Sequence, residues 1–162
     1  MIPDHDIGCP IPDVPESVFG EYNWFFSAIS FGRILSQAYT SLFSVSAAFQ
    51  TTEEYHVAIE EIETRLERWR MAVPVDFRPG TPFHGPDVLP YSFPEPSFKM
   101  IVLQTNFSYY ALVIALARLK MHIDRQGQSR RQEDSKRLLM DTARAVVEGS
   151  KNVDMAAHTP NL

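Results

Sequence analysis

The segment from Trp24 to Phe49 restricts the possible folds of this chain more than any other feature. It is rich in aromatic and aliphatic residues, contains no proline and carries one charged residue, Arg33. As a single α-helix it would be about 39 Å long, at a rise of 1.5 Å per residue. A helix that is apolar on nearly all sides has to be buried by other elements. If it is buried all round, Arg33 needs a polar partner inside the protein, whereas an exposed Arg33 would mark one side of the helix as a surface.

The composition is that of an ordinary globular chain and narrows the functional classes. The 162 residues, 44% of them hydrophobic, fit one domain or part of a larger one. The net charge of −5 argues against direct binding of this chain to a nucleic-acid backbone. A single cysteine, Cys9, cannot form an internal disulfide or a cysteine metal cluster. Residues 1–6 lack the basic start and apolar centre of a signal peptide.

The apolar stripes, caps and prolines predict an all-α fold of about four antiparallel helices, two of them long and largely buried. Residues 1–15 are expected to form an extended acidic leader. We predict helices at about 16–49, 51–73, 97–122 and 131–148.

The second predicted helix has the clearest signals. Thr51 and Glu54 have the spacing of a capping box, which would start this helix directly after the first one. The short connection predicts that the two helices are antiparallel neighbours. One apolar stripe follows at alternating steps of four and three residues, made by Tyr55, Ile59, Ile62, Leu66 and Trp69.

Residues 73–97 hold seven of the twelve prolines. This density is incompatible with a helix or a central strand. We expect a long, semi-rigid surface loop between the second and third helices, anchored by Phe77, Phe83, Leu89, Tyr91 and Phe93. The helical domain then spans 16–149, and residues 150–162 form a flexible tail.

A membrane hairpin is an alternative that the sequence leaves open. Trp24–Phe49 is long enough to span a bilayer, and Met100–Ala117 is a second uncharged stretch. However, Arg33 in mid-segment would cost about 2.5–3.5 kcal/mol. Both stretches also contain several polar residues, so we favour a protein without a membrane span.

No group of residues predicts catalysis or metal binding. His56 and Glu60 lie one helical turn apart, but a metal site needs three or four convergent ligands. No glycine-rich phosphate loop and no nucleophile elbow occurs in the sequence. We therefore expect neither an enzyme nor a bound cofactor. The remaining candidate is a pocket for a small apolar ligand between the first and third helices, lined by Tyr109, Tyr110, Trp24 and Phe31.

Four strings of residues follow one another in a characteristic order. They are Asp4-His5-Asp6-Ile7-Gly8-Cys9-Pro10-Ile11-Pro12, then Arg33-Ile34-Leu35-Ser36-Gln37-Ala38-Tyr39, then Leu66-Glu67-Arg68-Trp69-Arg70 with Pro74 and Phe77-Arg78-Pro79, and last Tyr109-Tyr110 with Ile114-Ala115-Leu116-Ala117-Arg118. Together they resemble the regulatory middle homology domain of fungal zinc-binuclear-cluster transcription factors. Leu119 stands where that family often has a proline after the arginine.

The resemblance implies the C-terminal portion of that domain and a nuclear protein that regulates transcription. The family's zinc cluster, which binds DNA, would lie outside these residues, so no zinc and no direct DNA contact are expected here. The resemblance also implies a protein partner or a second copy, bound through an exposed apolar helix surface, and a possible small-molecule inducer. The alternative is a self-contained helical bundle that binds a small apolar ligand or a protein partner.

Overall fold

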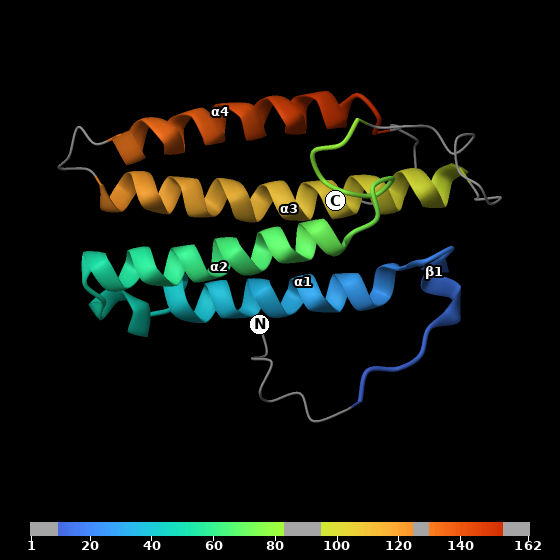
Figure 1. Ribbon diagram of the computed structural model, residues 1–162, viewed down its shortest axis with the longest axis horizontal. Helices are drawn as coiled ribbons and strands as arrows, with labels where there is room; N and C mark the ends of the chain where they lie inside the picture. Colours follow the sequence, from blue (N-terminus) through green and yellow to red (C-terminus); the bar gives the residue numbers. More distant parts are fainter. Residues whose placement is uncertain (1–9, 83–94, 125–129, 154–162) are drawn as a thin grey trace. The chain divides into compact units, whose positions relative to one another are not determined.

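The structure is a computed structural model that describes residues 10–82, 95–124 and 130–153. The predicted all-α class is confirmed, with α-helices α1 to α4 in the described part of the chain (Figure 1). The chain divides into two compact units, Met1–Arg78 and Pro79–Leu162. Each unit is described by itself below.

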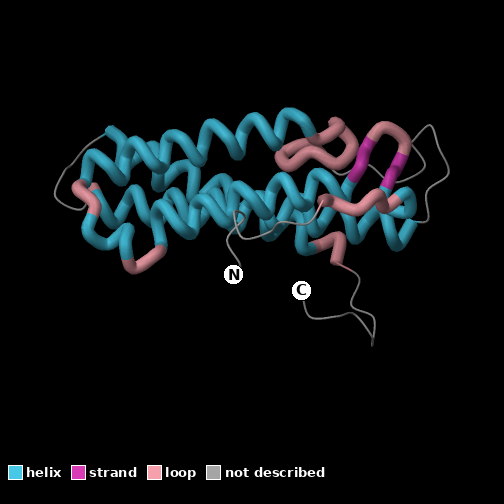
Figure 2. Tube along the Cα trace, turned by 90° about the horizontal axis from the view of Figure 1, so that it is seen from below, coloured by secondary structure: helices cyan, strands magenta, loops and turns pink. Residues whose placement is uncertain are grey.

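The first predicted helix does not begin near residue 16. A 3-10 turn, η2 (Pro15–Ser17), leads instead into an antiparallel hairpin of β1 (Val18–Phe19) and β2 (Tyr22–Asn23), drawn in magenta in Figure 2. Gly20 in the connecting turn has a φ of 61°, a left-handed conformation that glycine adopts without a steric cost. The prediction was wrong here because a helix cannot continue through this residue.

Helix α1 (Trp24–Ala38) begins directly after the hairpin. The Asn23 side chain caps its start by accepting a hydrogen bond of 3.0 Å from the backbone N–H of Phe26.

The end of α1 also differs from the prediction. A π-helical turn, η3 (Tyr39–Phe43), and a 3-10 turn, η4 (Ser46–Phe49), follow it. Side-chain hydroxyls compete for the backbone acceptors here, because Ser44 Oγ donates to the Thr40 carbonyl at 2.7 Å. The expected single helix is therefore a 15-residue α-helix with irregular ends, and it is shorter than the roughly 20 residues of a membrane span.

One side of α1 is a surface. Ile34 and Ala38 are buried, whereas Arg33 is exposed. Large apolar side chains of α1 and the two turns after it are also exposed to solvent: Phe26, Leu35, Tyr39, Phe43, Val45 and Phe49. The exposed Arg33 thus settles the question that the sequence raised about this segment.

Helix α2 (Thr52–Ala72) follows the prediction closely. Thr51 N–H donates to the Glu54 carboxylate at 2.7 Å and Glu54 N–H donates to the Thr51 hydroxyl at 3.3 Å, which completes the capping box. Four residues of the predicted stripe are buried, namely Ile59, Ile62, Leu66 and Trp69. The helix ends two residues before Pro74, as the conformational restriction of a residue preceding proline requires.

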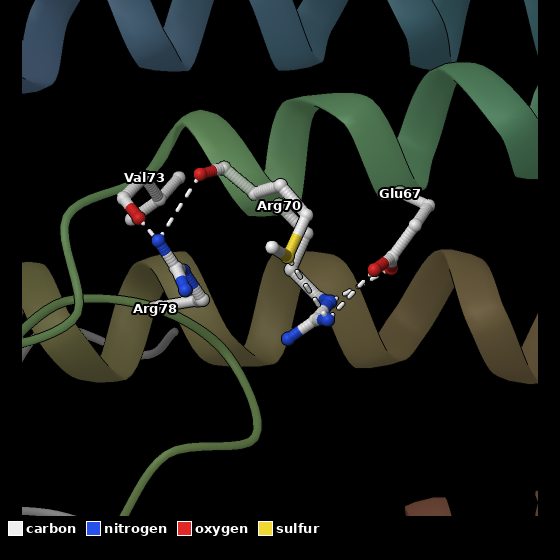
Figure 3. Close-up of polar contacts among 5 residues, drawn as sticks. Glu67, Arg70, Val73 and Arg78 are labelled. Atoms are coloured by element: carbon white, nitrogen blue, oxygen red, sulfur yellow. Dashed lines mark hydrogen bonds and ion pairs between the residues drawn. The ribbon is translucent and has the colours of Figure 1, made fainter.

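Arg78 closes the C-terminal end of α2. Its Nε donates to the Val73 carbonyl at 2.9 Å and its Nη2 donates to the Met71 carbonyl at 3.1 Å (Figure 3). Carbonyls at this end of a helix lack intrahelical donors, and the helix dipole favours a cation there. Nearby, the Arg70 guanidinium donates two hydrogen bonds to the Glu67 carboxylate. These bonds hold the pKa of Glu67 below its ordinary value, although burial opposes the shift.

Of the residues predicted to anchor the loop after α2, Phe77 lies in the described part of the chain, and it is buried as expected. Phe77 is completely buried, and its ring lies 4.6 Å from that of Tyr22 in the hairpin. The other predicted anchors, at positions 83, 89, 91 and 93, lie outside the described residues, as do residues 1–9 of the predicted leader and 154–162 of the tail.

The second unit contains α3 (Glu95–Ile123) and α4 (Arg130–Ser150), which pack side by side (Figure 1). Both begin and end within two residues of the predicted bounds. Gly149 of α4 lies beside the Phe107 ring of α3, and a Cβ at this position would be in ordinary van der Waals contact with the ring, at 3.4 Å.

The buried positions of α4 include two polar residues. Ser135 and Thr142, seven residues apart, are buried, whereas the apolar Leu138 and Val147 are exposed.

One described helix meets the length and composition of a membrane span. It is the part of α3 from Phe98 to Ile123, whose most apolar window is 50% buried inside the protein. Buried core helices of soluble proteins also meet these criteria.

The capping box makes the stability of α2 depend on pH. Hydrogen bonds from the Thr51 backbone and hydroxyl lower the pKa of Glu54, whose unfolded value is about 4.3. A carboxyl with a lowered folded pKa stabilises the fold above its unfolded pKa, and this contribution is lost as the pH falls through the folded pKa. We expect Glu54→Gln to lower the thermal unfolding midpoint at neutral pH and to match the parent chain in strong acid.

Thermal unfolding followed by circular dichroism across this pH range would test the expectation. Glu60→Gln, in the middle of the same helix, is the matched control and should leave the pH dependence unchanged. A gap between Glu54→Gln and the parent chain that is the same at every pH would contradict the role of the charge.

The cap at the C-terminal end of α2 predicts that Arg78 contributes more than Arg70 to the free energy of unfolding. Arg78→Ala leaves two helix carbonyls without their charged donor and should lower the free energy of unfolding by about 1–2 kcal/mol. Arg70→Ala removes a pair whose Glu67 side chain is 52% exposed, so the loss should be below about 1 kcal/mol. Urea unfolding of both variants measures the two losses, and equal losses would argue against the cap.

Candidate functional site: an arginine-lined groove on the first unit

An open groove of about 540 Å³ runs along the α1–α2 pair, and we call it the arginine groove. The α1 wall carries Phe26, Ser27, Ser30, Arg33 and Ile34. The α2 wall carries Arg65, Arg68, Trp69 and Ala72. The hairpin residues Glu21, Tyr22 and Asn23 close one end together with Pro74. All of these residues belong to the first unit.

The groove exists because short side chains face each other across the two helices. Ser27 and Ser30 on α1 and Ala72 on α2 leave space that larger residues would fill. The spacing is helical on both walls: Ser27, Ser30 and Ile34 on α1, and Arg65, Trp69 and Ala72 on α2, follow steps of three and four residues.

Trp69 joins the two walls. Its indole N–H donates to the backbone carbonyl of Ser27 at 2.9 Å. Its ring also packs against Phe31, with 4.9 Å between the ring centres. Trp69 is buried, so this contact fixes the start of α1 against the end of α2.

A second polar link lies further along the pair. Gln37 of α1 donates to the Glu61 carboxylate at 2.9 Å and accepts a hydrogen bond from the Arg65 guanidinium. Because Ser27 meets Trp69 and Gln37 meets Glu61, the two helices run antiparallel. The contact with Gln37 also holds Arg65 at the edge of the groove.

The groove is cationic within an acidic chain. Arg33 on one wall and Arg65 and Arg68 on the other face a single lining carboxylate, Glu21. The chain as a whole has a net charge of −5. Guanidinium groups recognise carboxylates and phosphates through paired N–H donors, so the groove offers binding chemistry for an anionic group.

A neighbouring hollow on α2 shares Arg65 and Arg68 with the groove, and it also contains Glu60 and Glu61. Glu61 lies near Arg65 at the contact with α1, because Gln37 donates to Glu61 and accepts from Arg65. The hollow carries two carboxylates, whereas Glu21 is the one carboxylate among the residues that line the groove, so an anion would favour the groove.

The four residues of the predicted ligand pocket fall into both units. Trp24 and Phe31 are half-buried in α1, and Phe31 contacts Trp69. Tyr109 and Tyr110 are half-buried in α3, with their rings edge to face at 5.5 Å. The pocket that would combine them therefore stays a prediction.

Sequence reasoning missed the groove, since Arg65 and Arg68 each look like ordinary solvated residues of a helix surface. The available signal was their position beside Trp69 and Ala72 on one side of the helix. Among the described residues, no group of three or more His, Cys, Asp or Glu side chains is placed to hold a metal ion.

Comparison with known proteins places distant relatives among fungal regulators. The chain is 28% identical over 130 residues to an ABC-transporter-regulating transcription factor of Aspergillus oryzae, and the match covers 74% of this chain. A protein of the same description from Aspergillus fumigatus is also 28% identical over 130 residues. The chain spans about 13% of the length of these curated relatives. No protein-family model matches the chain, and no solved structure matches it. The chain therefore has distant homologues that are fungal transcription factors.

Proposed function

We propose that this chain is a regulatory segment of a fungal-type transcription factor, corresponding to the C-terminal portion of the middle homology domain. In this proposal, the zinc cluster and the DNA contacts belong to residues outside the chain, and the protein acts in the nucleus. The chain itself contributes helical packing surfaces through which the activity of the factor is regulated.

The observation that carries the proposal is the similarity to two fungal transcription factors over 74% of this chain. A match of that extent includes most of the helical elements and is not limited to one apolar stripe. Because the chain spans about 13% of each relative, a role as one segment of a larger protein fits better than a complete factor.

A structural observation also supports the proposal. The third string that resembles the family, which begins at Leu66 and ends at Pro79, forms the end of α2 and the loop after it. Three of its residues hold this region together: Trp69 donates a hydrogen bond to α1, Phe77 is buried against Tyr22, and Arg78 caps the helix. These residues therefore share one structural role, which is to hold the end of α2 against α1 and the hairpin. This role gives a physical reason for their order and spacing in the string.

The exposed apolar side chains on α1 and the turns after it support a packing role. Phe49 is 87% exposed and Val45 is 84% exposed. Exposed apolar clusters mark contact surfaces. We propose that another part of the factor, a protein partner or a second copy covers them.

The alternative of a self-contained bundle for a small apolar ligand has less support. The groove is open and has three arginines on its walls, whereas sites for small apolar ligands are largely enclosed and apolar. A small-molecule inducer remains part of the proposal only at the level of the whole factor.

A reporter assay tests the proposal. The full chain would be fused to an unrelated DNA-binding domain and expressed in a fungal cell with a matching reporter gene. We expect transcription to rise or fall relative to the DNA-binding domain alone, because the segment would recruit or restrain other factors. Ile62→Asp, which places a charge at a fully buried position, is the misfolded control and should abolish the effect.

Two outcomes would contradict the proposal. One is reporter activity identical to that of the DNA-binding domain alone at equal protein levels. The other is a salt-sensitive shift of duplex DNA by the isolated chain, which would mean that these residues contact the nucleic-acid backbone themselves.

A further inference from the structure

We propose that the arginine groove binds an acidic, amphipathic polypeptide segment. Carboxylates of the segment would pair with Arg33, Arg65 and Arg68, and an apolar side chain would lie against Phe26 on the groove wall. The inference depends on the geometry of the first unit alone and does not require that the chain regulates transcription.

The shape of the groove suits a polypeptide. Its α1 wall extends from Phe26 to Ile34, and Asn23 closes the end. Asn23 and Ile34 are eleven positions apart in the sequence, a rise of about 17 Å along a helix. That length matches about three turns of a bound helix, and the open form leaves the rest of such a segment in solvent, as in other helix-in-groove complexes.

The charge of the groove selects the chemistry of the segment. Arginines on both walls can pair with carboxylates on the two flanks of one bound helix, while the single lining carboxylate, Glu21, lies at the hairpin end. A basic segment would be repelled by all three guanidinium groups. The chain as a whole has a net charge of −5, so the three arginines make the groove a local exception.

The apolar part of the groove provides a contact for a large side chain. Phe26 is 41% exposed at the α1 wall, and Ala72 on the facing wall is exposed as well. Aromatic residues and arginines carry much of the binding energy in protein interfaces. The combination of an accessible aromatic ring with three arginines fits a helical segment with leucine or phenylalanine on one face and acidic residues on both flanks.

Nucleic acid fits the groove less well. A duplex presents phosphates over a surface much larger than one groove, and the adjoining hollow that shares Arg65 and Arg68 also carries Glu60 and Glu61. The experiment below distinguishes this occupant from a polypeptide.

Fluorescence anisotropy of the full chain would test the proposal. The probe is a labelled helical peptide of about 12 residues, with glutamates on both flanks and leucines on one face. We expect saturable binding at physiological salt, and at least tenfold weaker binding, about 1.4 kcal/mol, for Arg65→Glu combined with Arg68→Glu. Phe26→Ala should weaken binding without changing its dependence on salt.

Matched controls separate the groove from general electrostatics. Arg118→Glu combined with Arg144→Glu makes the same change in net charge at exposed positions of the second unit and should leave peptide binding unchanged. A peptide with lysines in place of the glutamates should not bind. Circular dichroism checks that each variant keeps its helices.

Three results would overturn the inference. They are equal binding of the lysine peptide, equal loss of affinity in both double variants, and tighter binding of duplex DNA than of the acidic peptide. Since the measurement uses no reporter, failure of the regulatory proposal and failure of the groove proposal would be seen independently.

Discussion

The contact between the Trp69 indole and the Ser27 carbonyl organises the first unit. It joins residues 42 positions apart, at 2.9 Å, and lies where the start of α1 meets the end of α2. Because Trp69 is buried, its indole N–H needs an acceptor inside the protein. Ser27 and Ser30 line the groove beside this contact, and their side chains are short.

The elements predicted best are those whose signals are local. Thr51 and Glu54 form the expected capping box, and Pro74 sets the end of α2. The hairpin at Val18–Asn23 could not be predicted, because two-residue strands carry almost no periodic pattern. The apolar content of 24–49 suggested one helix, but Thr40 and Ser44 redirect backbone hydrogen bonds in a way that hydrophobicity does not report.

The groove was beyond sequence reasoning for a different reason. Arg65 and Arg68 lie on a helix whose exposed face also holds many glutamates, so each of them looks like part of a balanced, solvated surface. Only the pairing of α2 with α1 places Arg33 opposite them. The site is thus a property of two helices together, whereas a pattern along one helix records only its own neighbours.

Arg33 also explains how α1 can be so apolar and still present a cationic surface. At about 100° per residue, Arg33 and Leu35 point about 200° apart around the helix axis. The buried Ile34 and Ala38 lie between these directions. Helix α1 therefore carries a cationic surface on one side of its contact with α2. On the other side, Leu35 and Tyr39 of the following turn η3 form an exposed apolar surface.

The two surfaces favour different kinds of contact. Permanent interfaces are rich in apolar side chains, which fits the Leu35 side and a chain that spans about 13% of its relatives. Pairing between charged groups mainly sets specificity and the rate of association, and it weakens with salt. The Arg33 side therefore has the chemistry of a reversible contact, and the Leu35 side has that of a permanent one.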